Sequence, residues 1–148
     1  MTEALNRVDR RFESWCNGSS INPIGEMELN KYFQTKKGTG ILATADKAGV
    51  VDAAIYARLH TMQDGTVAAI MRDRLSHENL QSNPHAVFMF IEDGPGYTGK
   101  RFYLTKVGEA DNPEAISVLS RRKPTAEGDE KRFLVYFRID RTRALVGD

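Results

Sequence analysis

Short apolar runs separated by turn residues dominate the sequence from Ile41 onward. The runs lie at residues 41–45, 50–57, 66–71, 86–92, 101–110 and 133–140. The turn between the first two runs is too short for a crossover helix, which favours an antiparallel hairpin. A doubly wound parallel sheet would alternate strands with helices throughout, and this sequence does not. The pattern therefore predicts a mainly β (α+β) fold, an antiparallel barrel of about six strands with short flanking helices.

Four other segments have the spacing or the end residues of short helices. Apolar residues that share one helical face recur at spacings of three and four near the N-terminus, at Leu5, Val8, Phe12 and Trp15. Further helices are predicted at residues 26–36 and 76–82 and from Pro113 onward. Ser76 is predicted to cap the helix at 76–82, and Asn83-Pro84 to end it. We therefore divide the chain into an N-terminal helical extension, residues 1–25, and a barrel domain, residues 26–148.

Length, charge and cysteine content argue against several classes of protein. A chain of 148 residues is expected to form one core, because two domains would each be near the size at which disulfides or metal ions are needed for stability. A formal charge of +1 argues against a nucleic-acid-binding or membrane-binding protein. The single cysteine, Cys16, excludes an intramolecular disulfide framework. No run reaches the ~20 apolar residues of a membrane span, and charges interrupt the N-terminal segment where a signal peptide would be apolar. A cytoplasmic location is therefore expected.

The segment 71–84, MRDRLSHENLQSNP, is the strongest candidate for a binding site. It follows a predicted strand and opens a helix, with Arg72, Arg74 and Ser76 at the entrance. A helix N-terminus presents free N–H groups and a partial positive charge, so two arginines and a hydroxyl there favour a phosphate group. The alternative is that Ser76 only caps the helix and that both arginines are solvated.

Small side chains distinguish the second and third apolar runs. Ala53, Ala54 and Ala57 lie in the second run, and Ala68 and Ala69 in the third. Such residues let a flat ligand approach the backbone. Close packing of another strand or subunit explains them equally well.

The sequence contains no recognisable catalytic or metal-binding motif. His60, His77 and His85 lack the spacing of metal ligands, so no metal site is predicted. The glycine-rich segment 94–100 has neither the dinucleotide-binding nor the P-loop spacing, and no serine or cysteine has the context of a nucleophile. Tyr56 and His77 are the only candidates for a general acid or base, and His77 is expected at the surface of its helix.

Three segments together resemble the pyridoxamine-phosphate-oxidase-like family of FMN-binding split barrels. They are GTGILATADKAGVVDAAIYA (38–57), DGTVAAIMRDRLSHENLQSNPHAVFMF (64–90) and GPGYTGKRFYLTKVGEA (94–110). NLQSNPHAV is similar to the family's NLxxNPxV pattern, and the segments follow the order of the family. The resemblance covers roughly half of the chain. It implies a six-stranded antiparallel split barrel that forms a homodimer and binds FMN between the two subunits.

The resemblance also implies which residues contact the cofactor. The second apolar run and the end of the third would lie beside the flavin ring and ribityl chain, and the turn that follows would bind the phosphate. Tyr97 and Arg101 would reach a cofactor held by the partner subunit. The implied set is Ala53, Ala54, Ile55, Tyr56, Ile70, Met71, Arg72, Arg74, Leu75, Ser76, Tyr97 and Arg101.

Two departures from the family limit what the resemblance implies about the substrate. The oxidase commonly has an Arg-Lys doublet where this chain has Leu75-Ser76, and its C-terminal substrate-binding pattern is absent. We therefore predict a dimeric FMN flavoprotein that acts as an oxidoreductase on a small substrate or electron partner other than pyridoxamine phosphate. Two alternatives remain: a module that binds FMN, haem or a deazaflavin without turnover, and a degenerate barrel that binds no cofactor.

Overall fold

The computed structural model describes residues 26–120 and 131–147. The helices in this part of the chain are α2 (Glu26–Thr35), α3 (Leu75–Ser82) and α4 (Pro113–Leu119). The strands are β1 (Gly38–Ala45), β2 (Val51–Tyr56), β3 (His60–Thr61), β4 (Val67–Arg72), β5 (His85–Glu92), β6 (Gly99–Ala110) and β7 (Arg132–Ala144). The helix predicted near the N-terminus and the extension 1–25 lie outside the described residues, so the domain boundary stays a prediction.

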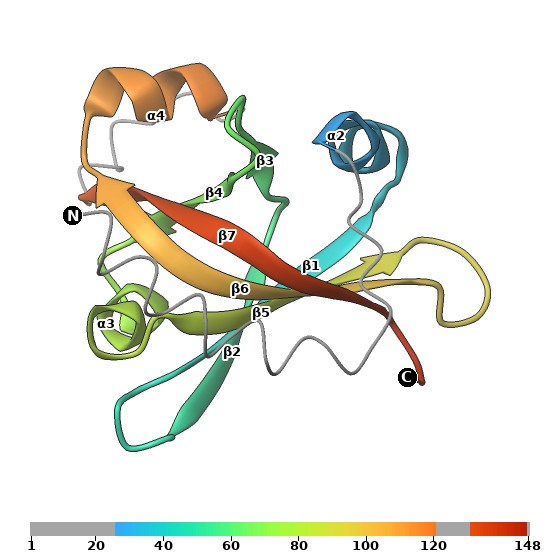
Figure 1. Cartoon of the computed structure of the whole chain (residues 1–148), viewed down its shortest axis with the longest axis horizontal. Coiled ribbons are helices and arrows are strands. Elements are labelled where there is room, and N and C mark those ends of the chain that lie inside the picture. The colour runs from blue at the N-terminus through green and yellow to red at the C-terminus, as the bar shows by residue number, and fades with distance from the viewer. Residues whose placement is uncertain (1–25, 121–130, 148) are drawn as a thin grey trace.

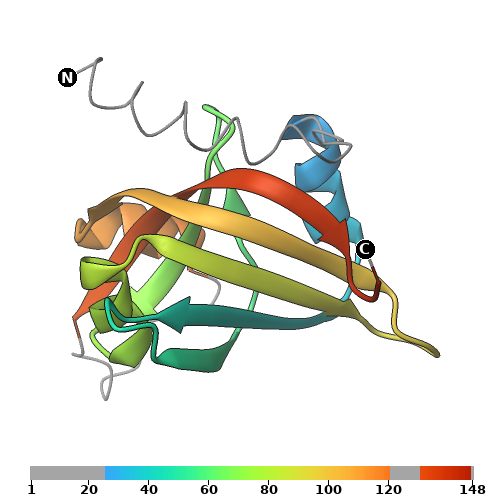
Figure 2. The same ribbon diagram turned by 60° about the horizontal axis from the view of Figure 1, so that its bottom comes forward.

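All seven strands belong to one antiparallel sheet, which confirms the mainly β (α+β) fold predicted from the sequence. The strand order is β2-β1-β5-β6-β7-β4-β3. The sheet curls into a split barrel, with β2 at one edge and β3 at the other (Figure 2). Six strands correspond to the six apolar runs. The seventh, β3, pairs with β4 over two residues only, and so short a strand has no alternating apolar pattern that a sequence could reveal.

The predicted hairpin at the start of the barrel is confirmed. Strands β1 and β2 pair antiparallel along their whole shared length. The Asp46 side chain closes the turn, because its Oδ1 accepts hydrogen bonds from the backbone N–H groups of Ala48 and Val50 at 2.8 and 3.0 Å. Gly49 takes a φ of +83°, which a glycine adopts without steric cost.

The main apolar core lies inside the curled sheet, against α2 and α3. Alternate residues of the strands point inward, as the two-residue period of a strand requires. The buried core residues include Leu29, Phe33, Leu42, Met71, Leu80, Phe88, Phe90, Phe102, Leu104, Val135 and Phe137. Helix α4 instead covers the outer face of β4 and β7, where Ile116 packs against Ala68 and Leu134. Strand β4 is therefore buried on both faces.

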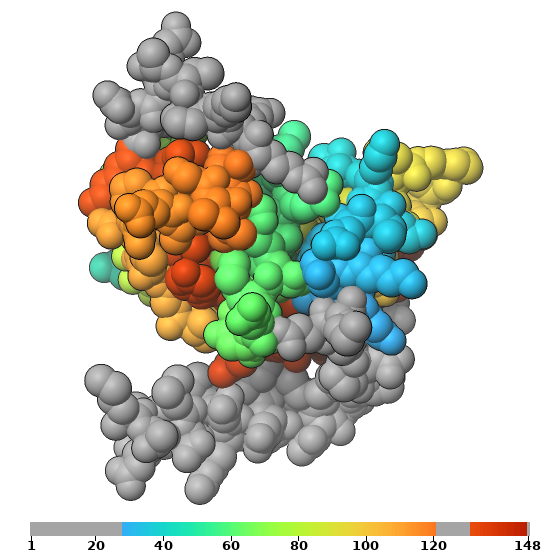
Figure 3. All heavy atoms as spheres, turned by 90° about the horizontal axis from the view of Figure 1, so that it is seen from above, coloured from blue at the N-terminus to red at the C-terminus, as the bar shows by residue number. Residues whose placement is uncertain are grey.

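The three helices occupy different parts of the barrel. Helices α2 and α4 lie on either side of the β3–β4 hairpin (Figure 3). Helix α3 contacts β1, β2 and β4. Because β2 and β4 lie near opposite edges of the sheet, α3 bridges the split between them (Figure 1). None of the described helices combines the length and the apolar character needed to cross a membrane.

Helix α3 begins one residue earlier than the sequence predicted. Arg74 occupies the N-cap position in an extended conformation, and its side chain makes no capping hydrogen bond. Ser76 is the second helical residue and does not cap the helix, so that prediction was wrong. The serine hydroxyl is turned to another partner, as described below. At the other end Asn83 is the C-cap, which confirms the predicted stop at Asn83-Pro84.

Candidate functional site

The turn between β4 and α3 presents backbone N–H groups at the start of the helix. The backbone N–H of Arg74 donates to the Arg72 carbonyl at 2.8 Å, which tightens the turn. The first hydrogen bond of the helix follows, from the Glu78 N–H to the Arg74 carbonyl at 3.0 Å. The N–H groups of the first helical turn therefore have no partner within the helix and carry its partial positive charge. Arg72 and Arg74 place two guanidinium groups on the same short turn, and both residues are exposed.

Tyr56 and Ser76 meet at this turn from different elements. Ser76 is buried in the first turn of α3, and Tyr56 is half-buried at the end of β2. Burial raises the pKa of the Tyr56 phenol and the charge of Asp52 adds to that increase, while the hydrogen bond of the phenol with Ser76 and the charge of Arg74 partly offset it. The structure thus brings together three of the predicted site residues, Tyr56, Arg74 and Ser76. The phenol stays protonated at neutral pH and offers a hydroxyl beside the Arg74 cation.

Strand β2 presents an open apolar edge next to this turn. Val51 and Ile55 are 77% and 78% exposed, and Ala53 lies between them on the same face. Ala54 and Tyr56 alternate with these residues and are partly buried. In the sheet order β2 has β1 as its only neighbour among the described strands. A flat ligand or a second protein surface could therefore lie against this strand.

The other residues predicted beside the turn differ in burial and in the face of the sheet on which they lie. Leu75 is 51% exposed at the start of α3. Met71 is completely buried in the main core, whereas Ile70 packs against the α4 cluster on the other face of β4. Neither of these two side chains lies on the exposed surface of the turn, so their predicted cofactor contact would have to involve the backbone.

The β5–β6 loop, which contains Tyr97, lies at the opposite end of the sheet from α3 (Figure 1), and Arg101 follows it at the start of β6. Strand β5 runs between the two ends and spans about 26 Å for its eight residues. Tyr97 is 83% exposed in the β5–β6 loop. Arg101 donates from Nε to the Ala144 carbonyl at 2.8 Å and from Nη2 to the Gly147 carbonyl at 2.5 Å. Within one subunit the structure does not bring this pair to the turn, and their predicted reach into a partner's site stays a prediction.

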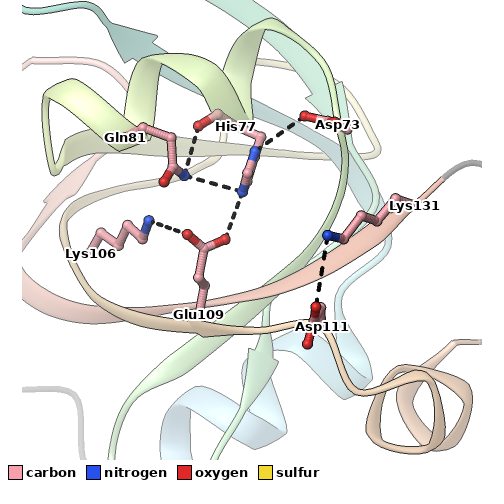
Figure 4. A network of polar contacts seen from close by, with 7 residues as sticks. All are labelled: Asp73, His77, Gln81, Lys106, Glu109, Asp111 and Lys131. Atoms are coloured by element: carbon pink, nitrogen blue, oxygen red, sulfur yellow. Dashed lines mark hydrogen bonds and ion pairs between the residues drawn. The ribbon is translucent and has the colours of Figure 1, made fainter.

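A buried polar network below the turn was not predicted from the sequence. His77, expected at the surface, is only 7% exposed, which corrects that prediction. Its ring stacks on Phe133 of β7 at 3.8 Å between centroids, and its Nε2 lies 2.6 Å from Glu109 Oε2 on β6 (Figure 4). The prediction of a surface position was wrong because the sequence around a single histidine in a short helix does not indicate which residues of distant strands will pack on it.

Glu109 is the anionic centre of this network. Lys106 Nζ lies 3.0 Å from its Oε1, on the same strand. Desolvation raises the pKa of Glu109, but hydrogen bonds from His77, Lys106 and Gln81 outweigh it and lower the pKa to about 2. The carboxylate is therefore ionised throughout the neutral range and accepts a hydrogen bond from the His77 ring.

Further buried hydrogen bonds fix α3 to the first hairpin. Asn79 Nδ2 donates to Thr44 Oγ1 at 3.0 Å, and both side chains are buried. Asn83 Nδ2 donates to the Asp46 carbonyl at 3.4 Å. These contacts give the NLQSNP segment a structural role, because they hold the helix, and hence its first turn, beside β2.

Solved structures with the same architecture include cofactor-binding proteins. An FMN-binding protein from Syntrophomonas wolfei subsp. wolfei has a TM-score of 0.65 and 17% identity, over 96% of this chain and 99% of that protein. An F420 reductase has a TM-score of 0.59 and 13% identity, over 76% of this chain and 94% of the reductase. A haem storage protein from Vibrio cholerae has a TM-score of 0.56 and 20% identity, over 80% of this chain and 93% of that protein.

No protein-family model matches the sequence, and no curated protein matches it. At these identities the structural similarity concerns the fold. It confirms, at that level, the architecture implied by the resemblance to the pyridoxamine-phosphate-oxidase-like family. The chain therefore has the split-barrel fold that the FMN-binding protein, the F420 reductase and the haem storage protein share.

Proposed function

We propose that this protein binds FMN as a homodimer and acts as an oxidoreductase on a small substrate or redox partner. The observation that carries the proposal is the meeting of Tyr56, Arg74 and Ser76 at the first turn of α3, beside the open strand β2. The FMN-binding split barrel among the structural neighbours supports the same cofactor.

The residues of the turn fit a phosphomonoester. A terminal phosphate carries close to two negative charges at neutral pH, and Arg72 and Arg74 supply two cations on one turn. Ser76 and Tyr56 add hydroxyl donors, and the first-turn N–H groups add the helix dipole. The phosphate would be held by charge-assisted hydrogen bonds, which are the strongest polar contacts available to a protein.

The outer face of β2 fits a flat ring system. Ala43 of β1 is directly opposite Ala53 of β2, so the sheet carries little side chain at that point. A ring could approach the backbone there and accept hydrogen bonds from it. FMN would supply the redox chemistry, while the protein determines the access and the electrostatic environment of the ring. Tyr56 points to the other face of β2, toward the first turn of α3, so its hydroxyl would serve the phosphate end of the cofactor.

We also propose that a second copy of the chain covers this face. The apolar surface formed by Val51 and Ile55 of β2 extends onto the neighbouring strands. Ile55 pairs with Ile41 of β1, which pairs with Met89 of β5, and both of these residues are partly buried. Exposed apolar side chains next to one another on a sheet mark an interaction surface. A two-fold dimer through this face would protect the edge strand β2 and is the arrangement implied by the family resemblance.

The test is the visible absorption spectrum of the purified protein, with and without added FMN, together with its molar mass by light scattering. The proposal expects a dimer that retains stoichiometric FMN through a desalting column and whose flavin is reduced by NADH, NADPH or another donor. A dimer that retains FMN but transfers no electrons would reduce the function to a binding module. A protein that does not retain FMN at all would contradict the proposed cofactor.

The same spectrum tests the alternative cofactors. The F420 reductase and the haem storage protein among the neighbours favour a deazaflavin or haem as the alternatives to FMN. A Soret band after addition of haem would identify haem, and retention of a deazaflavin instead of FMN would identify that cofactor. The cytoplasmic location expected from the sequence remains part of the proposal.

A further inference from the structure

His77 is a buried titratable residue to which the proposed FMN binding gives no role. It follows Ser76 directly and is the third residue of α3, so its backbone belongs to the first helical turn. Its ring points away from the turn into the polar network of Figure 4. A change in the charge of this ring would occur immediately below the proposed phosphate site.

Two carboxylates flank the His77 ring, one at each nitrogen. Nε2 lies 2.6 Å from Glu109 Oε2, and Nδ1 lies 3.6 Å from Asp73 Oδ1. A neutral imidazole has one N–H and one lone pair, so it can donate to only one of these groups. A doubly protonated ring donates to Glu109 and places a positive charge 3.6 Å from the Asp73 carboxylate, which is the distance of an ion pair. Protonation of the ring would therefore place a cation between two carboxylates.

Other charged groups face the ring from β6 and from the residue before β7. Lys106 of β6 is paired with Glu109 at 3.0 Å. Lys131 immediately precedes β7, and its Nζ lies 5.1 Å from the centroid of Phe133, the residue on which His77 stacks, and 3.8 Å from Asp111 Oδ2. On α3 itself, the uncharged Gln81 places its Nε2 3.1 Å from His77 Nε2 and donates to the His77 carbonyl at 3.2 Å. Each of these lysines thus has its own carboxylate, and the His77 ring lies within ion-pair distance of Asp73 at the turn.

Asp73 connects the ring to the proposed phosphate site. It lies between Arg72 and Arg74 in the sequence, and 68% of its side chain is exposed. The negative charge of Asp73 repels a phosphate and weakens the field of the neighbouring arginines. A proton on His77 offsets that charge. The protonated ring would remain stacked on Phe133 and buried from water.

We propose that His77 is a positioning residue of the FMN site and that protonation of its ring strengthens phosphate binding by neutralising Asp73 and fixing the first turn of α3. The proposal rests on the proposed FMN-binding function. Imidazole side chains change charge between pH 5 and 8, so the effect would make cofactor retention depend on pH. By thermodynamic reciprocity, bound FMN must favour the protonated ring by the same factor.

The phosphate of FMN titrates in the same range and with the opposite sign. Its second ionisation, near pH 6, increases the charge of the ligand as the pH rises. The pH profile of the wild type alone therefore mixes two effects. The ratio of dissociation constants between a His77 variant and the wild type removes the contribution of the ligand, because both proteins bind the same FMN.

The test measures the FMN dissociation constant by fluorescence quenching between pH 5.5 and 8.5. The variants are His77→Gln, which keeps a donor for Glu109 but cannot titrate, and the control His85→Gln, which removes a histidine that contacts Thr105 outside the network. We expect His77→Gln to weaken binding about three- to tenfold at pH 5.5 and to have little effect at pH 8.5. The His85→Gln ratio should be flat. A folded His77→Gln protein with a pH-independent ratio would overturn the proposal.

A second measurement on the wild type does not depend on the folding of a variant. NMR follows the titration of the His77 ring with and without FMN. The same coupling predicts that FMN moves the midpoint upward by about half to one pH unit. An unmoved midpoint in protein that binds FMN overturns the role of His77 alone. If the wild type binds no FMN at any pH, the proposed function fails and this inference fails with it.

Discussion

Helix α2 meets the barrel with aromatic rings, whereas helix α3 meets it with polar side chains. Phe33 of α2 contacts Phe88, Phe90 and Phe102, with ring centroids 5.5 to 6.2 Å apart. Helix α3 instead buries Ser76, His77 and Asn79. Those three make up most of the buried polar residues in the described part of the chain.

The two ends of the barrel therefore serve different purposes. Packed aromatic rings give large, non-directional stabilisation, and the polar contacts of α2, such as the hydrogen bond from the Tyr32 hydroxyl to Glu92, lie at the margin of this aromatic cluster. Buried polar groups stabilise little unless every hydrogen bond is made, but they fix orientation. The cost of burying them at the α3 end is consistent with a site whose geometry must be maintained. The four predictions below test this division, in order of decreasing expected effect.

Phe33→Ala should cause the largest loss of stability. The side chain is 3% exposed, and its removal leaves a cavity among three other rings. Large-to-small substitutions of this kind cost about 4 kcal/mol. Urea unfolding monitored by fluorescence measures the effect, and Gln34→Ala on the exposed side of α2 is the control. A loss below about 1 kcal/mol would show that the α2 end does not stabilise the barrel.

Arg74→Ala combined with Ser76→Ala should weaken FMN binding by about 3 kcal/mol, roughly a hundredfold in Kd. The reason is the loss of charge-assisted hydrogen bonds to the phosphate. Equilibrium dialysis or fluorescence titration measures the change. The matched control, Lys47→Ala with Ser82→Ala, removes one cation and one hydroxyl away from the first turn. Unchanged affinity in the test variant would mean that the phosphate lies elsewhere.

Asn79→Ala should destabilise the protein by about 2 kcal/mol, because it leaves the buried Thr44 hydroxyl without its donor. Thr44→Val removes the other partner while nearly preserving its shape. In a double-mutant cycle the two changes should be clearly non-additive. Additive losses of stability would show that the hydrogen bond does not connect α3 to β1.

Glu109→Gln should change the acid dependence of stability by on the order of 1 kcal/mol, after the partial exposure of the carboxylate is taken into account. Its folded pKa of about 2 lies below the ordinary value of 4.5. The unfolded chain therefore binds more protons between these values, so this contribution is full above about pH 5 and is lost as the pH falls toward 2.

Urea unfolding at several pH values between 2 and 7 measures this contribution. The wild type should lose more stability on acidification than Glu109→Gln. Glu78→Gln, an exposed glutamate on α3, is the control and should follow the wild type. Parallel curves for the wild type and Glu109→Gln would show that the network below the turn does not retain the ionised carboxylate.

The strands and helices were largely predictable because their signals are local. Alternating apolar residues and turn chemistry placed six strands, and Pro113 marked the first residue of α4, with Asn112 as its cap. The boundaries shifted by a few residues, most visibly at the start of α3. Arg74 occupies the N-cap position that was expected for Ser76, and its side chain makes no capping hydrogen bond. The N-cap rule failed there because the Ser76 hydroxyl is bonded to Tyr56 of a distant strand.

The candidate site was predictable only in part. The sequence pointed to Arg72, Arg74 and Ser76 because they are neighbours along the chain, and the family resemblance added Tyr56. It did not reveal that Ile70 and Met71 would turn to opposite faces of β4, into two separate clusters. Nor did it reveal the network of Glu109, Phe133 and His77.

By itself the sequence determined the antiparallel barrel, the hairpin at its start and the position of the arginine-bearing turn, since each of these depends on residues close together in the chain. Only the tertiary structure decided which polar groups are buried and what they contact. Glu109 and Phe133 lie 32 and 56 positions after His77, and no periodicity relates residues so far apart. Their contacts arise because β6 and β7 pair beside α3, so the closing of the sheet, and not the local pattern, gives His77 its environment.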